Sequence, residues 1–292
     1  MIAAGECGTL LLSEDSGQNW EILEKLTTQN LRDIEFYDSN QGVAVGDSGL
    51  IMRSTDGGHT WIKTATPTNR NLYGVSFVDS ATIIAVGRYS TILYSADGGN
   101  NWGFIDSPVV ADYYDIRFPE TKKGIIVGSN SEDEAVILHS TDEGSSWSIV
   151  IYGKYNLLYS ISFINSLEGY AAGYQGTVLK TTDWGLSWEQ KPNTTKSFYK
   201  ILFLNQDTGF AIFNYPSVSI YRTTDGAMSW YNITPPDQEF FRTVINTSQN
   251  KLFAFGTGGF ISRSDDFGAN WSEISHGIKK HFIDIQFIDE QN

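Results

Sequence analysis

One eight-residue pattern recurs along the chain at nearly constant spacing, and it constrains the fold more than any other feature. The pattern is [ST]-x-D-x-G-x-x-W, and it occurs seven times, once with alanine in place of the glycine. Its last residues are Trp20, Trp61, Trp102, Trp147, Trp188, Trp230 and Trp271, with spacings of 41, 41, 45, 41, 42 and 41 residues. A period of this length is typical of repeat architectures in which each unit packs against its neighbours.

Each repeat unit has the pattern of four short β-strands. In the second unit, β-branched and alternating residues mark candidate strands at 31–36, 42–46, 50–55 and 61–66. Glycine and asparagine separate these segments, as expected for hairpin turns, and no segment has a convincing helical period. Four strands per unit of about 40 residues is the size of a propeller blade. The sequence therefore predicts an all-β fold, a single seven-bladed β-propeller of four-stranded antiparallel blades.

The two ends of the chain match different strands of one blade. Residues 2–8 match the second strand of the repeat, whereas residues 283–292 match the first strand. We therefore expect the C-terminal strand to complete the N-terminal blade, which would consist of 1–25 together with 280–292. Such a closure pairs the sheet edges that an open ring would leave exposed. We expect 1–292 to form one propeller domain.

Composition narrows the classes of partner. The chain has 292 residues, with 20 Lys and Arg against 34 Asp and Glu, a formal net charge of −14. Such a charge disfavours a nucleic-acid partner, because phosphate binding needs a basic face.

The single cysteine, Cys7, excludes an intramolecular disulfide and a cysteine-based zinc site. No apolar run approaches the roughly 18 residues of a membrane span, and the first residues lack the features of a signal peptide. We expect a monomer that does not insert into membranes.

The repeated residues have a structural explanation. Each aspartate can accept N–H bonds from its own turn, the next glycine suits a positive φ, and the tryptophan supplies apolar surface between blades. Ala227 replaces that glycine in one repeat, which predicts a strained or altered turn. Seven equivalent carboxylates lack the asymmetry of a catalytic site, so we assign them a structural role. They are Asp15, Asp56, Asp97, Asp142, Asp183, Asp225 and Asp266.

The repeated pattern resembles the Asp-box, or BNR repeat, over essentially the whole chain. The chain also contains L-Y-x-[IV]-x-F, as in 72–77, and G-x-A-x-G-x-x-G, as in 42–49. In this combination it most resembles the photosystem II stability/assembly factor family and its bacterial relatives, within the sialidase-like propeller superfamily. The resemblance implies a non-catalytic binding or assembly protein that is exported to a periplasm, a lumen or the cell surface. It also implies an arginine-rich patch, whereas the eight arginines of this chain are dispersed.

A search for catalytic motifs leaves one group of carboxylates. Sialidases also carry Asp-boxes, but their F-R-I-P motif is absent, and residues 116–119 read Ile-Arg-Phe-Pro. Glycosidases use paired carboxylates, and Asp33, Asp115 and Asp284 share one equivalent position on the first strands. These aspartates could form a cluster near the channel, or they could be solvated or bonded to backbone. No phosphate loop, H-E-x-x-H or C-x-x-C motif occurs and the four histidines are scattered, so we expect no metal and no cofactor.

We expect function on the face opposite the Asp-boxes, where the loops are irregular. Just before the first strands, equivalent positions hold residues of the types favoured at protein interfaces: Arg32, Tyr73, Tyr114, Tyr159, Tyr199 and Arg242. Alternatively, the tyrosines pack between blades, because they share strand parity with the buried apolar residues. The loop 129–135 carries Glu132, Asp133 and Glu134, which would steer a basic partner.

The sequence thus predicts a non-catalytic scaffold that contacts a protein partner through this loop face. The alternative is a carbohydrate-active Asp-box propeller, either a glycan binder or a glycoside hydrolase. Paired carboxylates that face a groove would favour the alternative. An aromatic-rich face without an acid pair would favour protein binding.

Overall fold

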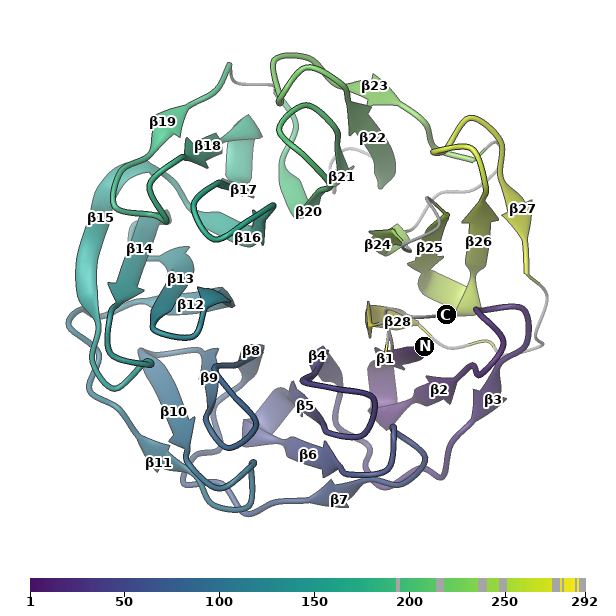
Figure 1. The fold of residues 1–292 in the computed structure, drawn as a ribbon, viewed down its shortest axis with the longest axis horizontal. Coiled ribbons are helices and arrows are strands. Elements are labelled where there is room, and N and C mark those ends of the chain that lie inside the picture. Colours follow the sequence, from purple (N-terminus) through teal and green to yellow (C-terminus); the bar gives the residue numbers. More distant parts are fainter. Residues whose placement is uncertain are drawn as a thin grey trace.

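The protein is a ring of seven four-stranded antiparallel sheets around a central channel (Figure 1). The computed structural model describes residues 1–192, 195–213, 218–235, 241–246, 251–274, 279, 281–286 and 288, without the side chains of 241, 242, 244–246 and 257. The arrangement confirms the seven-bladed β-propeller that the repeat predicts. Along the described part of the chain, no helix is long and apolar enough to cross a bilayer.

The strands of each blade follow one another outward from the channel. The inner strands are β4 (Leu31–Phe36), β8 (Leu72–Phe77), β12 (Asp112–Glu120), β16 (Leu158–Phe163), β20 (Phe198–Phe203), β24 (Phe241–Asn246) and β28 (Phe282–Gln286). The second strands are β5 (Gly42–Gly46), β9 (Ile83–Gly87), β13 (Lys123–Ser129), β17 (Gly169–Gly173), β21 (Gly209–Phe213), β25 (Leu252–Gly256) and β1 (Ile2–Gly5). The third strands are β6 (Ile51–Ser54), β10 (Thr91–Ser95), β14 (Glu134–Ser140), β18 (Val178–Thr181), β22 (Ser219–Thr223), β26 (Ile261–Ser264) and β2 (Leu10–Leu12).

The outer strands differ most in length between blades. They are β7 (Ile62–Lys63), β11 (Gly103–Phe104), β15 (Ser148–Asn156), β19 (Glu189–Gln190), β23 (Tyr231–Asn232), β27 (Ser272–Glu273) and β3 (Glu21–Ile22). The nine-residue β15 belongs to the unit with the 45-residue spacing. Three-residue turns with a positive φ at the middle residue connect second and third strands in four blades, as η1 (Glu6–Gly8), η2 (Asp47–Gly49), η3 (Tyr174–Gly176) and η4 (Thr257–Gly259).

The ring closes by strand pairing between the two ends of the chain. The sheet order is β28-β1-β2-β3, and Ile2, Ala3 and Ala4 pair with Gln286, Ile285 and Asp284. Figure 1 accordingly shows β28 beside β1, next to the N label. The C-terminal strand therefore completes the N-terminal blade as predicted, although Phe287, which the repeat also assigns to this strand, lies outside the described residues.

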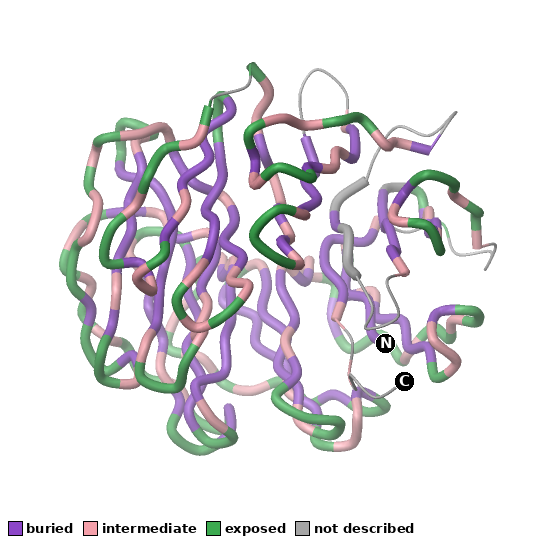
Figure 2. Tube along the Cα trace, turned by 45° about the horizontal axis from the view of Figure 1, so that its top comes forward, coloured by how far each residue is buried: buried purple, intermediate pink, exposed green. Residues whose placement is uncertain are grey.

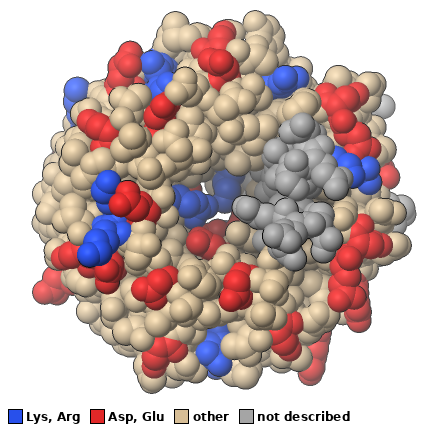
Figure 3. Space-filling model, viewed as in Figure 1, with Lys and Arg blue, Asp and Glu red and all other residues tan. Residues whose placement is uncertain are grey.

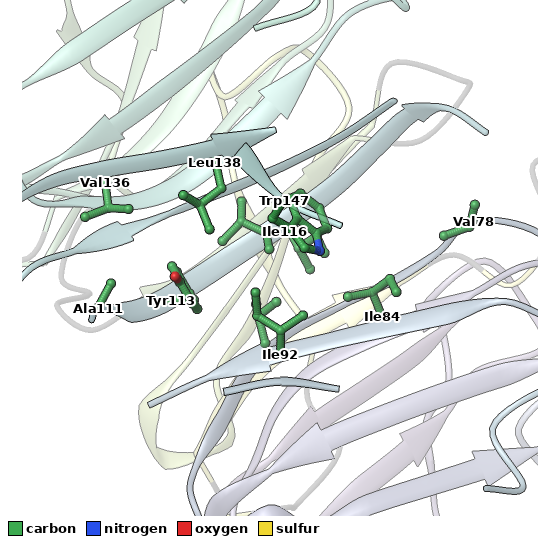
Figure 4. Packing of buried hydrophobic residues seen from close by; sticks show 11 residues of the cluster. Val78, Ile84, Ile92, Ala111, Tyr113, Ile116, Val136, Leu138 and Trp147 are labelled. Carbon is green, nitrogen blue, oxygen red and sulfur yellow. The ribbon is translucent and has the colours of Figure 1, made fainter. Parts of the chain in front are cut away.

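Most of the hydrophobic core lies between neighbouring blades. The inner three strands of a blade, such as β4, β5 and β6, are mostly buried, whereas outer strands such as β7 and the connecting loops are mostly exposed (Figure 2). In one cluster, Ile84 and Ile92 of the β8–β11 blade pack against Ile116, Val136 and Trp147 of the next blade (Figure 4). Since each sheet has a neighbour on both faces, its strands carry near-continuous apolar runs such as Gly-Val-Ala-Val-Gly in β5.

Hydrogen bonds within each Asp-box hold the turn from third to outer strand. At the third box, Ser95 Oγ donates to Asp97 Oδ1 (3.0 Å) and accepts from the Gly99 N–H (2.9 Å). Asp97 also accepts from the backbone N–H of Asn101 (2.9 Å) and from its side-chain amide (2.7 Å). The bonds from Asn101 lower the pKa of Asp97, and all seven box aspartates have a lowered pKa. These carboxylates are thus engaged within their own turns, as the structural explanation predicts.

The residue before each box tryptophan contributes a bond that the sequence pattern left unassigned. In all seven boxes this residue is Asn, Ser or Thr, and its side chain donates to the second oxygen of the aspartate. The box glycines have positive φ, as predicted. Ala227 adopts the same left-handed conformation (φ 69°), so its turn is strained rather than altered.

Removal of residues 280–292 tests the ring closure. The deletion leaves β1 with an unpaired edge, and it removes the buried Phe282 and Ile285 from an apolar cluster and so uncovers the rest of that cluster. We expect loss of cooperative unfolding or aggregation, because exposed edges template association. Thermal melting with light scattering measures both. An unchanged melting temperature in a monodisperse sample would contradict the closure.

Substitutions within the second Asp-box separate packing from hydrogen bonding. Trp61 is buried, lies edge-on to Phe36 and donates to the Gly58 carbonyl (2.9 Å). Trp61→Ala should lower the free energy of unfolding by about 3–5 kcal/mol, the cost of truncating a buried large aromatic. Asp56→Ala should cost about 1–2 kcal/mol, the scale of a lost capping interaction. Urea denaturation measures both, and a larger loss for Asp56→Ala would show that packing is secondary.

Candidate binding site at the channel mouth

Four tyrosines form an arc at the mouth of the channel. Tyr73, Tyr114, Tyr159 and Tyr199 lie near the start of four consecutive inner strands, β8, β12, β16 and β20. Neighbouring ring centroids are 5.6, 5.2 and 6.1 Å apart along the arc. Each ring is half-buried. The tyrosines therefore pack on one another across blades while each keeps part of its surface exposed.

The arc bounds a cavity of about 170 Å³. The lining residues are Arg32, Asp33, Tyr73, Tyr114, Asp115, Tyr159, Tyr199, Lys200 and Ile283. Basic and acidic side chains are visible inside the central opening (Figure 3). Five of the six aromatic and basic residues singled out in the sequence thus line one cavity. The sixth, Arg242, is on β24, and its side chain lies outside the described residues.

Arg32 is held in place by a carboxylate from a turn of its own blade. Its Nε and Nη2 atoms donate to the two oxygens of Asp47 at 2.8 and 2.9 Å. The side-chain amide of Asn30 donates to the same carboxylate (2.8 Å). This bidentate pair fixes the guanidinium at the edge of the cavity.

The three aspartates of the inner strands join each blade to the next. Asp33 Oδ2 accepts from the Val75 N–H (2.8 Å), and Asp115 Oδ2 accepts from the Ile161 N–H (3.0 Å). Asp284 Oδ2 makes the equivalent, longer contact with the Ile34 N–H (3.4 Å). Of the alternatives left open by the sequence, both hold in part: the aspartates are bonded to backbone, and Asp33 and Asp284 also lie close together in the channel.

Two cations compensate these carboxylates inside the channel. Lys200 Nζ lies 3.0 Å from Asp284 Oδ1, and Arg117 Nη1 lies 3.1 Å from Asp115 Oδ1. Arg117 also lies 3.8 Å from a carboxylate oxygen of Glu35. Lys200 occupies the aspartate position of its own blade, so the departure from the repeat places a cation among equivalent acids.

Arg117 and Glu35 belong to the charged cluster in the channel, but the sequence did not lead us to predict them as site residues. Each lies two residues after a channel aspartate, and alternate residues of a strand share a face. A charged residue two positions after a channel-facing aspartate was therefore the available signal. The prediction rested on the first of the two positions alone, so it did not include Glu35 and Arg117.

Burial perturbs the acids of this cluster. Burial raises the pKa of Asp33 well above its usual value, and the adjacent Asp284 carboxylate raises it further. Burial likewise raises the pKa of Glu35 to about 7, although Arg117 and the Phe77 N–H oppose the shift. Burial alone would lower the pKa of Lys200, but the carboxylates of Asp284 and Asp33 raise it, so the ammonium keeps its charge.

The acidic loop 129–135 folds as a closed turn beside the channel mouth. Asn130 Oδ1 accepts from the backbone N–H groups of Glu132 and Glu134, and its side-chain amide donates to the Glu134 carboxylate (2.9 Å). Asp133 adopts a positive φ of 59°. Glu132 and Asp133 are exposed, whereas Glu134 is half-buried. Two of the three predicted steering charges therefore point to solvent.

Metal ligation has no evident basis among the described residues. No three His, Cys, Asp or Glu side chains in that part of the chain are arranged to hold a metal ion.

The ring of seven blades and the Asp-box turns define the class of protein, a seven-bladed β-propeller with a tyrosine-lined channel mouth. The chain belongs to the photosynthesis system II assembly factor YCF48 family, whose model matches residues 1–55 and 58–154.

Comparison with solved structures gives the same fold. A structure described as YCF48 bound to D1 peptide has a TM-score of 0.77 at 20% identity, over 96% of this chain and 94% of that chain. YCF48 from Cyanidioschyzon merolae has a TM-score of 0.74 at 20% identity, over 94% of each chain. The GH74 enzyme of Niastella koreensis is less similar, with a TM-score of 0.54 at 13% identity, over 93% of this chain and 62% of that chain. No curated protein matches the sequence significantly.

The raised pKa of Glu35 predicts a pH-dependent stability. The folded protein binds this proton more tightly than the unfolded chain does, so the carboxyl stabilises the fold below about pH 4.5, and this contribution is lost as the pH rises through about 7. Glu35→Gln keeps a neutral side chain at every pH. The free energy of unfolding of Glu35→Gln minus that of the parent should therefore rise between pH 5 and pH 8. Urea denaturation at both pH values measures it, and a flat or falling difference would contradict the assignment.

Proposed function

We propose that the chain is a non-catalytic protein-binding module that serves in the assembly of a larger complex, and that its partner docks over the channel mouth. The tyrosine arc carries the proposal, because four partly exposed rings converge on one cavity beside Arg32. Tyrosine and arginine dominate binding hot spots at protein interfaces. Family membership and the solved YCF48 structure bound to a D1 peptide support a protein partner.

The loops of this face are preorganised by bonds between blades. The N–H of a positive-φ residue in a second-to-third-strand turn donates to a side chain at the start of the next inner strand or just before it. Such bonds run from Cys7 to Asn30 Oδ1 (2.9 Å), from Ser48 to Asn71 Oδ1 (3.0 Å), from Tyr89 to Asp112 Oδ1 (2.7 Å) and from Gln175 to Ser197 Oγ (3.1 Å). A surface held in this way loses little conformational entropy when a partner binds, which favours affinity.

A second aromatic and basic group extends the face outward from the cavity. Tyr89 is 57% exposed, and its ring has the guanidinium of Arg88 at 4.9 Å and that of Arg70 at 5.8 Å. Arg70 Nη1 also donates to the Tyr89 carbonyl (2.7 Å). This group presents a large rigid side chain beside the arc, in the manner of an interface anchor.

The geometry of the channel carboxylates favours binding over glycoside hydrolysis. A glycosidase needs two carboxyl groups open to the substrate. Asp33, Asp115 and Asp284 are each 5% exposed or less and accept N–H groups of the adjacent blade. Their engagement in holding the ring supports the protein-binding proposal.

Single substitutions in the arc test the docking face. Tyr114→Ala or Tyr159→Ala should weaken partner binding about tenfold or more, mainly through faster dissociation, because hot-spot truncations cost about 2 kcal/mol. Crosslinking in cells followed by mass spectrometry supplies the partner, and surface plasmon resonance measures the kinetics.

The acidic loop should affect association instead. Glu132→Gln with Asp133→Asn should lower the association rate, and this decrease should become smaller at high salt.

The matched control is Tyr231→Ala, which truncates an exposed tyrosine on the outer strand β23. It should leave the kinetics unchanged. Circular dichroism verifies the folding of every variant. If the arc variants bind like the parent while Glu143→Ala or Met228→Ala in the Asp-box turns weakens binding, the partner docks on the opposite face.

A further inference from the structure

One blade has an outer strand that is long enough to pair along its free edge. The strand β15 has nine residues, whereas each of the other six outer strands has two. It is the last strand of its sheet and lies on the rim of the ring (Figure 1). Within the described part of the chain, β14 is its only strand partner, so the backbone N–H and C=O groups on its outer side are unpaired.

The side chains of this edge are largely apolar. The four consecutive residues Ile149, Val150, Ile151 and Tyr152 carry no charge, and Ile149 and Tyr152 are 48% and 52% exposed. A long apolar edge is a template for pairing with another chain, and proteins normally shorten or charge such edges. Bulges at Val150 and near Gly153 bend β15, so regular pairing is confined to a few residues. The edge therefore suits a short added strand.

Acidic turns flank both ends of this edge. One end follows the fourth Asp-box, and the other lies against the loop 129–135, because Asn156 pairs with Glu134. None of the exposed or half-buried acids at the tips of these two turns forms an ion pair with another described residue; they are Glu132, Asp133, Asp142 and Glu143. The only charged residue of β15 itself is Lys154. An added strand with basic residues at both ends would meet opposite charges.

The same charges disfavour a second copy of this chain as the added strand. Antiparallel pairing of two β15 strands would place the acidic loop of one copy beside the Asp-box turn of the other, which carries Asp142 and Glu143. Parallel pairing would place the two acidic loops side by side. Like charges repel in both arrangements. Charge complementarity therefore selects a different, basic segment.

The edge also leads to the docking face. The N–H of Leu157, the residue after β15, donates to the carbonyl of Asp133 in the acidic loop (2.9 Å). Tyr159 of the tyrosine arc follows on the next inner strand, β16. A protein that covers the channel mouth thus has a continuous path past the acidic loop to the rim.

We propose that the outer edge of β15 binds an extended segment of the protein partner as a fifth strand of this blade. The segment has a short apolar centre with lysine or arginine on both sides. Backbone hydrogen bonds to β15 hold the centre, and the two acidic turns attract the ends. The inference rests on the proposed function for the kind of partner, a protein, and it adds a second contact surface to the docking face.

Synthetic peptides test the edge without the partner. The probe is acetyl-Lys-Lys-Val-Thr-Val-Thr-Lys-Lys-amide. One comparison peptide has glutamate in place of every lysine, and the other is N-methylated at the central valines and threonines, so that these residues cannot donate backbone bonds. Isothermal titration calorimetry on the purified protein measures the affinities. We expect the probe to bind at least about tenfold more tightly than either comparison peptide, because each lacks one of the two contributions.

Variants locate the binding on β15. Ile149→Asn with Tyr152→Asn removes apolar contact and β-propensity from the edge without a change of charge, and it should weaken the probe about tenfold. The matched control is Ile62→Asn on the two-residue outer strand β7, where the side chain is 62% exposed. This control should bind the probe like the parent. Circular dichroism confirms that each variant is folded.

Four outcomes would overturn the added strand. Equal binding of the N-methylated peptide would mean contact through side chains alone, and preference for the glutamate peptide would mean the wrong partner chemistry. No binding at about 1 mM would mean a closed edge. A dimer in light scattering that Ile149→Asn with Tyr152→Asn abolishes would mean that a second copy occupies the edge. In each case, weaker partner binding in Tyr114→Ala or Tyr159→Ala would leave the docking face standing, so the two proposals fail separately.

Discussion

Packing between blades is the interaction on which the rest of the structure depends. One four-stranded sheet with apolar residues on both faces cannot shield them alone, so each blade requires a neighbour on either side. The core clusters accordingly combine residues from adjacent blades, as with Ile84 and Trp147. A closed ring gives every blade two neighbours, and it also fixes the distances between equivalent positions at the channel mouth. The centroid spacing of 5.2–6.1 Å between neighbouring tyrosines follows from this constraint.

The sequence predicts those features of the fold that recur in every blade. The spacing of the tryptophans predicts the number of blades, and the mismatch between the two ends of the chain predicts the pairing of β28 with β1. Local chemistry was also readable, since the box aspartate bonds to residues within four positions of itself. The Asn, Ser or Thr before each tryptophan was visible in the sequence, but its bond to the aspartate becomes clear only from the folded turn.

The site was predictable only in part, because its chemistry depends on contacts across the channel. Because Arg32 and the tyrosines occupy equivalent positions in the repeat, the sequence predicts that they lie at the same height in the ring. In the structure they line one cavity. The pairing of Lys200 with Asp284 joins strands that are not adjacent in the ring, and no spacing rule relates them. The same holds for the contact between Arg117 and Glu35. In this ring the tyrosines of the candidate site follow the repeat, whereas its charge pairs across the channel depart from it, and symmetry does not predict them.

The pairing of β28 with β1 has a consequence for how the protein folds. The contacts that join Ile2 to Gln286 span nearly the whole sequence, and contacts of such separation form late because they require a large loop to close. During synthesis, the blade of β1, β2 and β3 must wait for its inner strand until residues 282–286 have left the ribosome. Until then, its apolar face and the face of the last blade are open to solvent. The final step of folding is therefore also the step at which a nascent chain is most exposed to misassociation and most dependent on chaperones.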